Sequence, residues 1–263
     1  MLGSIIGDVI GSAYEFHPTK ELDFPLFTDR TTFTDDTVLT VAVASCLLDG
    51  KDYGKTLKDF TLRFPDRGYG SRYHNWAYSD STQPYNSFGN GSAMRVSPVG
   101  FAFSTREEIL AEAKKSAMVT HNHPEGIKGA QAVALATFLA QQGASKYEIK
   151  TQIESDFGYD LQRDYLEIKL EYDFDETCQG SIPEAFSAFL ASDNFEDALR
   201  KAVALGGDAD TQACIVGGIA EAFYKEIPSE LITQTALLLP QEFIEIIERF
   251  YLKFLGIPGI LKV

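Results

Sequence analysis

The sequence is poor in cysteine and has no long apolar run, and both absences restrict the class of protein. Cys46, Cys178 and Cys214 are its only cysteines among 263 residues, and no two of them form a C-x-x-C pair. This argues against a disulfide framework or a structural zinc site and favours a reducing compartment. No apolar run reaches the roughly 18–20 residues of a membrane span. The N-terminal segment "MLGSIIGDVIG" lacks the basic start of a signal peptide. We therefore expect a cytoplasmic protein that does not bind membranes.

Basic residues are also scarce. The chain has 23 Lys and Arg against 38 Asp and Glu, which gives a net charge of −15. A protein that binds duplex nucleic acid needs a basic face, so we expect no nucleic-acid duplex as a partner. Two explanations of the acidic excess stay open: it keeps the protein in solution, or part of it forms a cation site.

Strand-like alternation is scarce, and helical patterns dominate. Apolar residues recur at helical spacing from Ile5 to Ala13. Thr105 with Glu108, and Ser145 with Glu148, match the capping box that begins helices. Further helices are expected at 35–48, 126–142, 183–191, 195–205, 211–225 and 241–254. The sequence predicts an all-α fold with one compact multi-helix domain over residues 1–263.

Two regions do not fit the helical pattern. Residues 165–174, "YLEIKLEYDF", alternate like a strand. Residues 65–104 are rich in Gly, Tyr and Ser, and we interpret them as a long irregular region that is too polar for the core. Long loops in compact domains are often functional, which makes this region a candidate ligand site.

Two segments place acids beside a threonine at the start of an apolar helical pattern. They are "TFTDDTVL", with Thr34, Asp35 and Asp36, and "GGDADT", with Asp208, Asp210 and Thr211. Helix capping explains part of each pattern, because Asp and Thr are good caps and acids favour a helix N-terminus. Together the segments form an all-oxygen ligand set that suits Mg²⁺ or Mn²⁺. Because burying several acids without a cation is costly, the pair favours a metal site.

A third cluster lies in "GDVIGSAYEF". Asp8 and Glu15 are either solvated helix acids or part of a site. Gly3, Gly7 and Gly11 form a stripe of small residues that permits close approach of another backbone. Glu15, near the helix end, could reach a site at that contact.

The irregular region and the segment after it offer ligand-binding groups. Glycines with Ser and Asn in "NSFGNGSAMR" suit a phosphate or ribose cradle, and Phe88 could stack on a base. His121 and His123 form an H-x-H pair, but the acidic clusters supply oxygen ligands and not nitrogen. We therefore expect these histidines to hydrogen-bond to a ligand or to the fold.

Six motifs in this order resemble the ADP-ribosylglycohydrolases, a family with an all-α fold and two Mg²⁺ or Mn²⁺ ions in a central cleft. They are "GDVIGSAYE", "TDDT", "PDRGYG", "SFGNGSAMR", "TH" and "GGDADT", and they run from residue 7 to 211. The family's second metal motif usually reads G-G-D-T-D-T, whereas Ala209 replaces the middle threonine here.

The resemblance implies roles for particular residues. It makes Thr34, Asp35, Asp36, Asp208, Asp210 and Thr211 metal ligands, with Asp210 between the ions. Glu15 matches a catalytic acid near the metals, and Asp8 is expected to support the site from outside the ligand shell. It places the substrate against Gly68, Gly70, Ser87, Phe88, Gly89, Asn90 and His121, with Phe88 on adenine.

The implied activity is hydrolysis of the bond between ADP-ribose and a protein side chain or a small conjugate. "GSAYE", "PDRGYG" and "SFGNG" resemble the hydrolases of serine-linked or other O-linked ADP-ribose more than the arginine-specific ones. Two alternatives remain: a metal-dependent phosphohydrolase that cuts a nucleotide diphosphate, and a non-catalytic ADP-ribose-binding protein.

Overall fold

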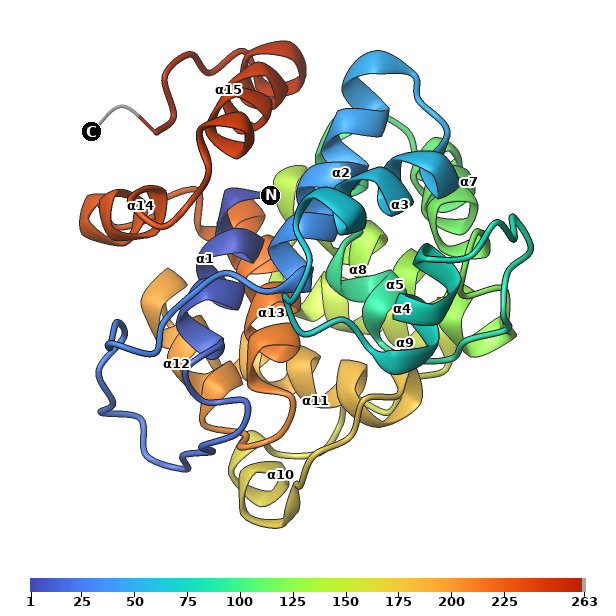
Figure 1. Cartoon of the computed structure of the whole chain (residues 1–263). Coiled ribbons are helices and arrows are strands. Elements are labelled where there is room, and N and C mark those ends of the chain that lie inside the picture. The colour runs from blue at the N-terminus through green and yellow to red at the C-terminus, as the bar shows by residue number, and fades with distance from the viewer. Residues whose placement is uncertain (262–263) are drawn as a thin grey trace.

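The computed structural model describes residues 1–261, and within this range every regular element is a helix (Figure 1). The helices are α1 (Leu2–Gly11), α2 (Asp35–Asp49), α3 (Tyr53–Arg63), α4 (Ser71–Ala77), α5 (Gly91–Met94), α6 (Ser97–Ala102), α7 (Arg106–Met118), α8 (Pro124–Gln141), α9 (Lys146–Phe157), α10 (Tyr165–Glu171), α11 (Cys178–Ala191), α12 (Phe195–Val203), α13 (Ala209–Tyr224), α14 (Ser229–Ala236) and α15 (Gln241–Leu255). The predicted all-α fold is confirmed.

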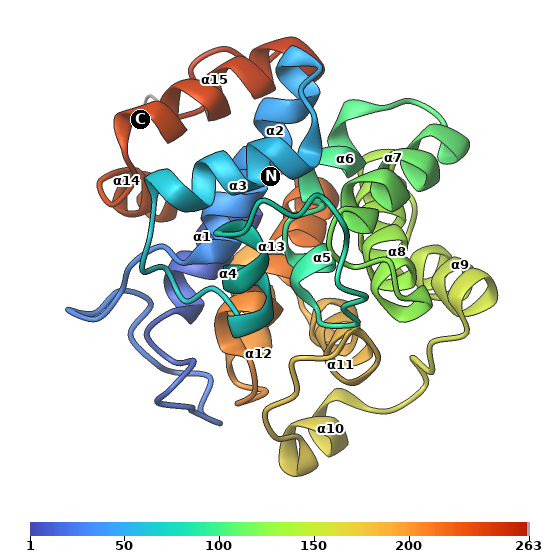
Figure 2. The same ribbon diagram turned by 45° about the vertical axis from the view of Figure 1, so that its right-hand side comes forward.

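Helix α13 forms the centre of the molecule. It packs against α1, α8, α11 and α12, which surround it in Figures 1 and 2. Its residues from Ala209 to Ala222 are buried, and every residue of α1 is buried as well. A helix that is apolar around its whole circumference belongs in the core, so the apolar run after the GGDADT segment is explained by its position.

The predicted glycine stripe of α1 is what lets it lie directly on α13. A Cβ atom on Gly7 would stand 2.0 Å from the carbonyl oxygen of Ala213, and one on Gly3 would stand 2.2 Å from that of Gly217. A Cβ atom on Gly11 would likewise stand 2.4 Å from the carbonyl oxygen of Ala209. The two backbones therefore touch, and this contact brings Asp8 near the start of α13.

Capping differs between the two predicted capping boxes. At α9 the Ser145 hydroxyl accepts from the Glu148 amide at 3.3 Å, and the Glu148 carboxylate accepts from the Ser145 amide at 2.8 Å. At α7 the Thr105 hydroxyl accepts from the Glu108 amide, but the Glu108 carboxylate accepts from the Thr105 hydroxyl and not from the Thr105 amide. The second box is thus only half formed.

The strand expected at 165–174 is wrong, because this segment begins with helix α10. Asp164 caps the helix by accepting from the Leu166 amide at 2.8 Å. Tyr165 and Ile168 are buried at a spacing of three, while Leu166 and Leu170 are exposed. An apolar residue at nearly every second position also satisfies a short helix, so alternation alone did not separate the two.

The expectation of a long, irregular and polar segment at 65–104 is wrong in part. The segment contains α4, α5 and α6, and residues from Ser92 to Phe101 are buried. A Cβ on Gly100 would stand 2.6 Å from the Thr137 side chain, so α6 packs closely on α8. Only the chain around these short helices is irregular.

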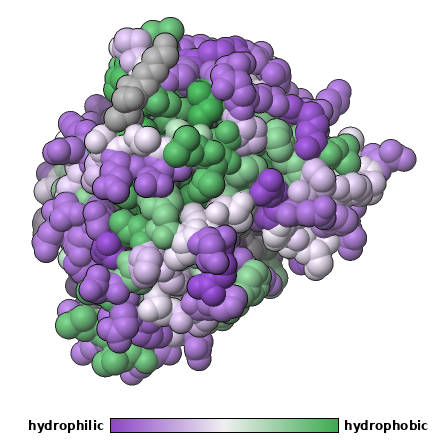
Figure 3. All heavy atoms as spheres, turned by 60° about the vertical axis from the view of Figure 1, so that its left-hand side comes forward, coloured by the Kyte–Doolittle hydropathy of each residue, from purple (hydrophilic) through white to green (hydrophobic). Residues whose placement is uncertain are grey.

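On the face seen in Figure 3, polar side chains surround a central apolar area, and smaller apolar areas lie toward the edges. Among exposed apolar side chains, Leu237, directly after α14, is 79% exposed, and Leu252 of α15 is 59% exposed. Among residues 1–261, no helix combines the length and the apolar character needed to cross a membrane.

Candidate metal centre and active site

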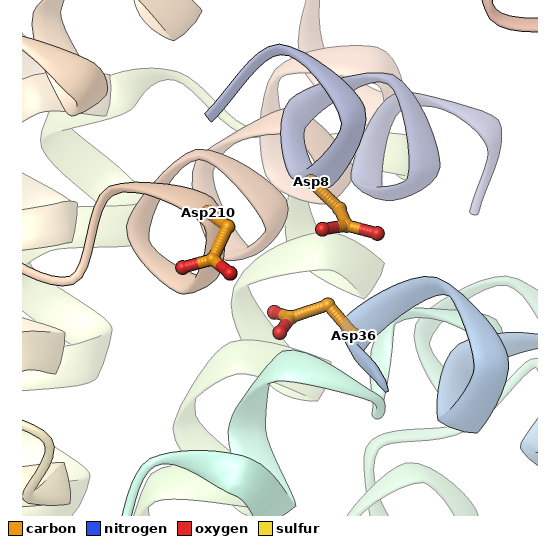
Figure 4. A group of neighbouring side chains, drawn as sticks. All are labelled: Asp8, Asp36 and Asp210. Carbon is orange, nitrogen blue, oxygen red and sulfur yellow. The ribbon is translucent and has the colours of Figure 1, made fainter. Parts of the chain in front are cut away.

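Three buried aspartates from three helices point toward one another (Figure 4). Asp8 comes from α1, Asp36 from the first turn of α2 and Asp210 from the first turn of α13. One carboxylate oxygen of each lies within 4.8 Å of the others. The contact between α1 and α13 and the start of α2 therefore converge on a single acidic centre.

Asp8 is held by the start of α2. Its Oδ1 accepts from the Thr34 hydroxyl at 2.6 Å, and its Oδ2 accepts from the amides of Thr34 and Thr37 at 3.0 and 3.1 Å. The Thr37 hydroxyl also donates to Oδ2. Because both oxygens are occupied by hydrogen bonds, Asp8 fixes the N-terminus of α2 and has little capacity left for a cation.

A second acidic group adjoins the first. Glu15, Asp208 and Asp210 each offer an oxygen within 4.8 Å of the others, and Asp210 belongs to both groups. The Asn90 amide donates to Asp208 Oδ2 at 2.7 Å, which orients that carboxylate from the glycine-rich segment. Because Asp210 belongs to both groups, its carboxylate could bridge two cations.

The donor set fits a hard divalent cation. Asp36 Oδ1 is buried without a hydrogen-bond partner among residues 1–261, and the Thr211 hydroxyl lies 3.3 Å from Asp36 Oδ2. None of these acids forms an ion pair with Lys, Arg or His in the described part of the chain. Oxygen ligands of this kind suit Mg²⁺ or Mn²⁺, and a cation would satisfy the buried oxygen.

Burial and mutual repulsion make the carboxyl groups weak acids. Burial, followed by the charge of Asp210, raises the pKa of Glu15 to about 8. Burial raises the pKa of Asp208 to about 6, against the opposing hydrogen bond from Asn90. Burial, followed by the charges of neighbouring carboxylates, also raises the pKa values of Asp35, Asp36 and Asp210. The protein alone therefore does not balance the charge of this centre.

A cavity of about 260 Å³ is lined by the acids Glu15, Asp35, Asp36, Asp208 and Asp210. Residues 87–91 also line it, with the His121 side chain beside Gly89 and Gly91. Phe88 is 40% exposed, and its ring lies 5.4 Å from that of His123. A ligand in this cavity could thus touch both the acids and an exposed aromatic ring.

The structure brings most of the predicted site residues to this cavity. Those that line it are Glu15, Asp35, Asp36, Gly68, Gly70, Ser87, Phe88, Gly89, Asn90, His121, Asp208, Asp210 and Thr211. Thr34 does not line it, because its hydroxyl is turned to Asp8. His123 caps α8 by accepting from the Glu125 amide at 3.1 Å, as expected for a histidine that bonds to the fold. The roles assigned to these residues stay predictions.

Sequence reasoning missed several groups on the cavity walls. Arg72, Tyr85, Arg95, Phe174 and Glu176 also line it. Arg95 is the last residue of the "SFGNGSAMR" motif. That motif was already expected to contact the ligand, so its position there could have indicated Arg95. Phe174 and Glu176 come from a distant part of the chain. The Asn90 amide donates a hydrogen bond to the Glu176 carbonyl at 2.8 Å, which joins this part to the glycine-rich segment. No local pattern predicts that pairing.

Known proteins are similar to this chain over most of its length. The family model described as ADP-ribosylglycohydrolase matches residues 1–256. The chain is similar to human ADP-ribosylhydrolase ARH3, with 28% identity in an alignment that covers 85% of this chain and 84% of the relative. The zebrafish protein of that name (Danio rerio) is 29% identical, covering 85% and 81%.

A solved structure is similar over nearly the whole chain. It is titled ADP-ribosylglycohydrolase-related protein complex and superimposes with a TM-score of 0.72 and 26% identity, covering 95% of this chain and 96% of the other. The family match, over residues 1–256, includes both acidic segments and the glycine-rich segment.

Proposed function

The chain belongs to the ADP-ribosylglycohydrolase family of hydrolases, and from this premise we propose that it releases ADP-ribose from ADP-ribosylated protein side chains or small ADP-ribose conjugates. We propose further that serine-linked and other O-linked conjugates are preferred over arginine-linked ones. The similarity to proteins named ADP-ribosylhydrolase ARH3 supports this preference, together with the "GSAYE", "PDRGYG" and "SFGNG" segments.

The observation that carries the proposal is that two acidic groups sharing Asp210, one with Asp36 and one with Glu15, meet at a cavity that the 87–91 segment also lines. We assign metal binding to Asp36, Asp208, Asp210 and Thr211, with Thr34 and Asp35 completing the predicted set. Two divalent cations bound there would polarise ribose hydroxyls and lower the pKa of bound water.

Glu15 is the proposed catalytic residue. Breaking the bond between ribose C1 and the side-chain oxygen develops positive charge at C1, and the surrounding carboxylates stabilise that charge. Water adds to C1, and its proton passes through the Glu15 carboxylate to the departing serine oxygen. The products are free ADP-ribose and an unmodified side chain. Without bound cations the pKa of Glu15 is about 8, and cations held by Asp210 would lower it, so that its carboxylate would accept a proton from water near neutral pH.

The ligand-binding wall is assigned to the other predicted residues. Asn90 connects the glycine-rich segment to the acids, because it belongs to that segment and its side-chain amide donates to Asp208. Ser87 and Gly89 would face the diphosphate, and Gly68 and Gly70 the distal ribose beside Asp35. Phe88 would stack on adenine.

Product analysis with a panel of conjugates tests the proposal. The protein is incubated with Mg²⁺ or Mn²⁺ and with serine-, arginine- and O-acetyl-linked ADP-ribose, and products are identified by mass spectrometry. We expect free ADP-ribose, released fastest from O-linked substrates. AMP with ribose phosphate would instead identify a phosphohydrolase, and tight ADP-ribose binding without release from any substrate would identify a non-catalytic binding protein.

A further inference from the structure

A buried arginine that lines the cavity is connected to His121 through hydrogen bonds to a threonine. Arg95 is fully buried, and its Nη2 donates to the Ser116 carbonyl at 3.0 Å and to the Thr120 hydroxyl at 2.9 Å. The Thr120 oxygen in turn lies 2.7 Å from Nδ1 of His121. Neither the acidic centre nor helix capping accounts for this chain of three side chains.

The chain of hydrogen bonds determines which imidazole nitrogen carries the proton. Arginine can only donate, so the Thr120 oxygen accepts from Arg95. Thr120 is fully buried, and among residues 1–261 its hydroxyl proton has His121 Nδ1 as its acceptor. If Nδ1 carried a proton, the Thr120 oxygen would face two donors and its own proton would be buried without an acceptor, which is costly. The satisfied arrangement leaves Nδ1 unprotonated.

The other nitrogen of His121 faces the ligand segment. A Cβ atom on Gly91 would stand 3.3 Å from His121 Nε2, and one on Gly89 would stand 3.8 Å from it. His121 lines the cavity and is 4% exposed, and its Nε2 has no hydrogen-bond partner in the described part of the protein. A proton on Nε2 is therefore available to a ligand atom beside the two glycines.

The surroundings also keep the ring neutral. Burial, followed by the nearby charges of Arg95 and Arg72, lowers the pKa of His121 well below its usual range. In a neutral ring with its proton on Nε2, this nitrogen can only donate. It therefore favours a ligand atom that accepts a hydrogen bond, such as an oxygen.

We propose that Arg95 and Thr120 are positioning residues that hold His121 as the Nε2–H tautomer, so that it donates a hydrogen bond to an oxygen acceptor of the ligand lying on residues 87–91. The identity of that ligand as ADP-ribose rests on the proposed function. The tautomer itself follows from the hydrogen-bond geometry and does not depend on the reaction.

Nitrogen NMR of the ligand-free protein measures the tautomer directly. The chain has four histidines, and the His121 signals are identified by their absence from His121→Gln. In the wild-type protein we expect Nε2 to show the shift of a protonated nitrogen and Nδ1 that of an unprotonated one. Thr120→Val removes the hydroxyl and should produce a mixture of tautomers, whereas Thr120→Ser should retain the wild-type spectrum. A protonated Nδ1 in the wild type, or an unchanged spectrum in Thr120→Val, would overturn the proposal.

Calorimetry with ADP-ribose connects the tautomer to binding. Thr120→Val should weaken ADP-ribose binding by about 3- to 30-fold, the range expected for loss of one oriented hydrogen bond. Thr120→Ser should bind within about 2-fold of wild type by the same reasoning. Thr137→Val is the matched control, because Thr137 is fully buried and, among residues 1–261, its hydroxyl bonds only to the Val133 carbonyl of its own helix. An equal loss of affinity in Thr137→Val would contradict a specific role for Thr120.

The two readouts separate the proposals. If wild-type protein does not bind ADP-ribose, the proposed function fails, while the positioning of His121 is still decided by the NMR spectrum. If ADP-ribose binds and the tautomer is the opposite one, the positioning proposal fails and the proposed function stands.

Discussion

At the scale of single residues, the site combines carboxylates with different tasks. Both oxygens of Asp8 accept hydrogen bonds from the start of α2, whereas Asp36 has one buried oxygen that finds no partner in the described part of the chain. Glu15 is only half buried and has a pKa of about 8. The same chemical group therefore serves as an anchor, a candidate metal ligand and a candidate proton carrier, according to its surroundings.

Replacing Glu15 by glutamine separates chemistry from binding. Glu15→Gln keeps the shape and removes the proton carrier, so ADP-ribose release should fall by about 10²- to 10⁴-fold. Affinity for ADP-ribose, measured by calorimetry, should change far less, because other residues hold the ligand. If extra Mn²⁺ restores the rate, Glu15 is a metal ligand and not the proton carrier. A wild-type rate would remove Glu15 from the mechanism.

Replacing Phe88 tests where adenine binds. Its ring is 40% exposed, and stacking on adenine should contribute about 1–3 kcal/mol. Phe88→Ala should therefore weaken ADP-ribose binding by that amount in calorimetry. Tyr147→Ala, an exposed aromatic residue outside the cavity, serves as the control and should bind normally. An unchanged dissociation constant for Phe88→Ala would place adenine elsewhere.

At the scale of elements, the contact between α1 and α13 determines the position of the acids. Gly7 and Gly11 place the backbone of α1 against that of α13, and this brings Asp8 and Asp210 together. Asp8 then ties the N-terminus of α2, which carries Asp36, to the same point. The acidic centre is thus a consequence of helix packing.

Gly7→Ala should disrupt this packing. The added methyl would stand 2.0 Å from the Ala213 carbonyl oxygen, and neither backbone can move without shifting its helix. We expect the free energy of unfolding, measured by urea titration without metal, to fall by about 3 kcal/mol or more, at the upper end for overpacking.

Gly54→Ala is the matched control. Gly54 also lies in a helix, but an added Cβ there meets atoms no closer than 3.4 Å. Alanine favours helix over glycine by up to about 1 kcal/mol, so this variant should be neutral or more stable. Equal stability of Gly7→Ala and wild type would contradict direct contact between the backbones.

The sequence was informative where the evidence is local. Helical periodicity predicted α2, α12, α13 and α15 closely, and the spacing of Gly3, Gly7 and Gly11 predicted a close helix contact. The oxygen-rich segments pointed to a cation without any knowledge of the fold. Their meeting point required the family resemblance, because no spacing rule relates residue 36 to residue 210.

Other features depend on tertiary contacts that no local pattern contains. Residues 165–171 alternate like a strand and are helical because Asp164 caps them and Tyr165 and Ile168 face the core. Residues 92–101 carry polar side chains and are nevertheless buried, since the Ser92 hydroxyl bonds to the Gly126 carbonyl at 2.7 Å. The connection from Arg95 to His121 is of the same kind.

At the scale of the whole molecule, the acidic centre makes stability depend on pH and on metal. Burial raises the pKa of Asp208 from 3.8 to about 6, and burial together with the Asp210 charge raises that of Glu15 from 4.5 to about 8. The folded protein therefore holds protons that the unfolded chain releases. Their stabilising contribution is complete below about pH 4 and is lost as the pH rises through 6 and then 8.

The melting temperature of the metal-free protein should accordingly fall between pH 5.5 and 8.5 by more than that of Asp208→Asn or Glu15→Gln. Divalent cations bind the deprotonated carboxylates, so the increase in melting temperature caused by Mn²⁺ should be larger at pH 8.5 than at pH 5.5. Scanning calorimetry with and without Mn²⁺ checks both trends. Equal slopes in wild type and both variants would mean that these carboxyls do not control the stability.

The most direct test of the account measures Mn²⁺ binding and ADP-ribose release on the same samples. Wild type, Asp36→Asn and Asp210→Asn are titrated with Mn²⁺ by calorimetry, and each sample is then given a serine-linked ADP-ribosyl peptide. Both variants should keep the helical circular dichroism of the wild type and lose Mn²⁺ binding and release together, with a metal-free stability at or above that of wild type. Wild-type release by Asp210→Asn, or by the wild-type protein in the presence of a chelator, would contradict a catalytic metal centre formed by these acids.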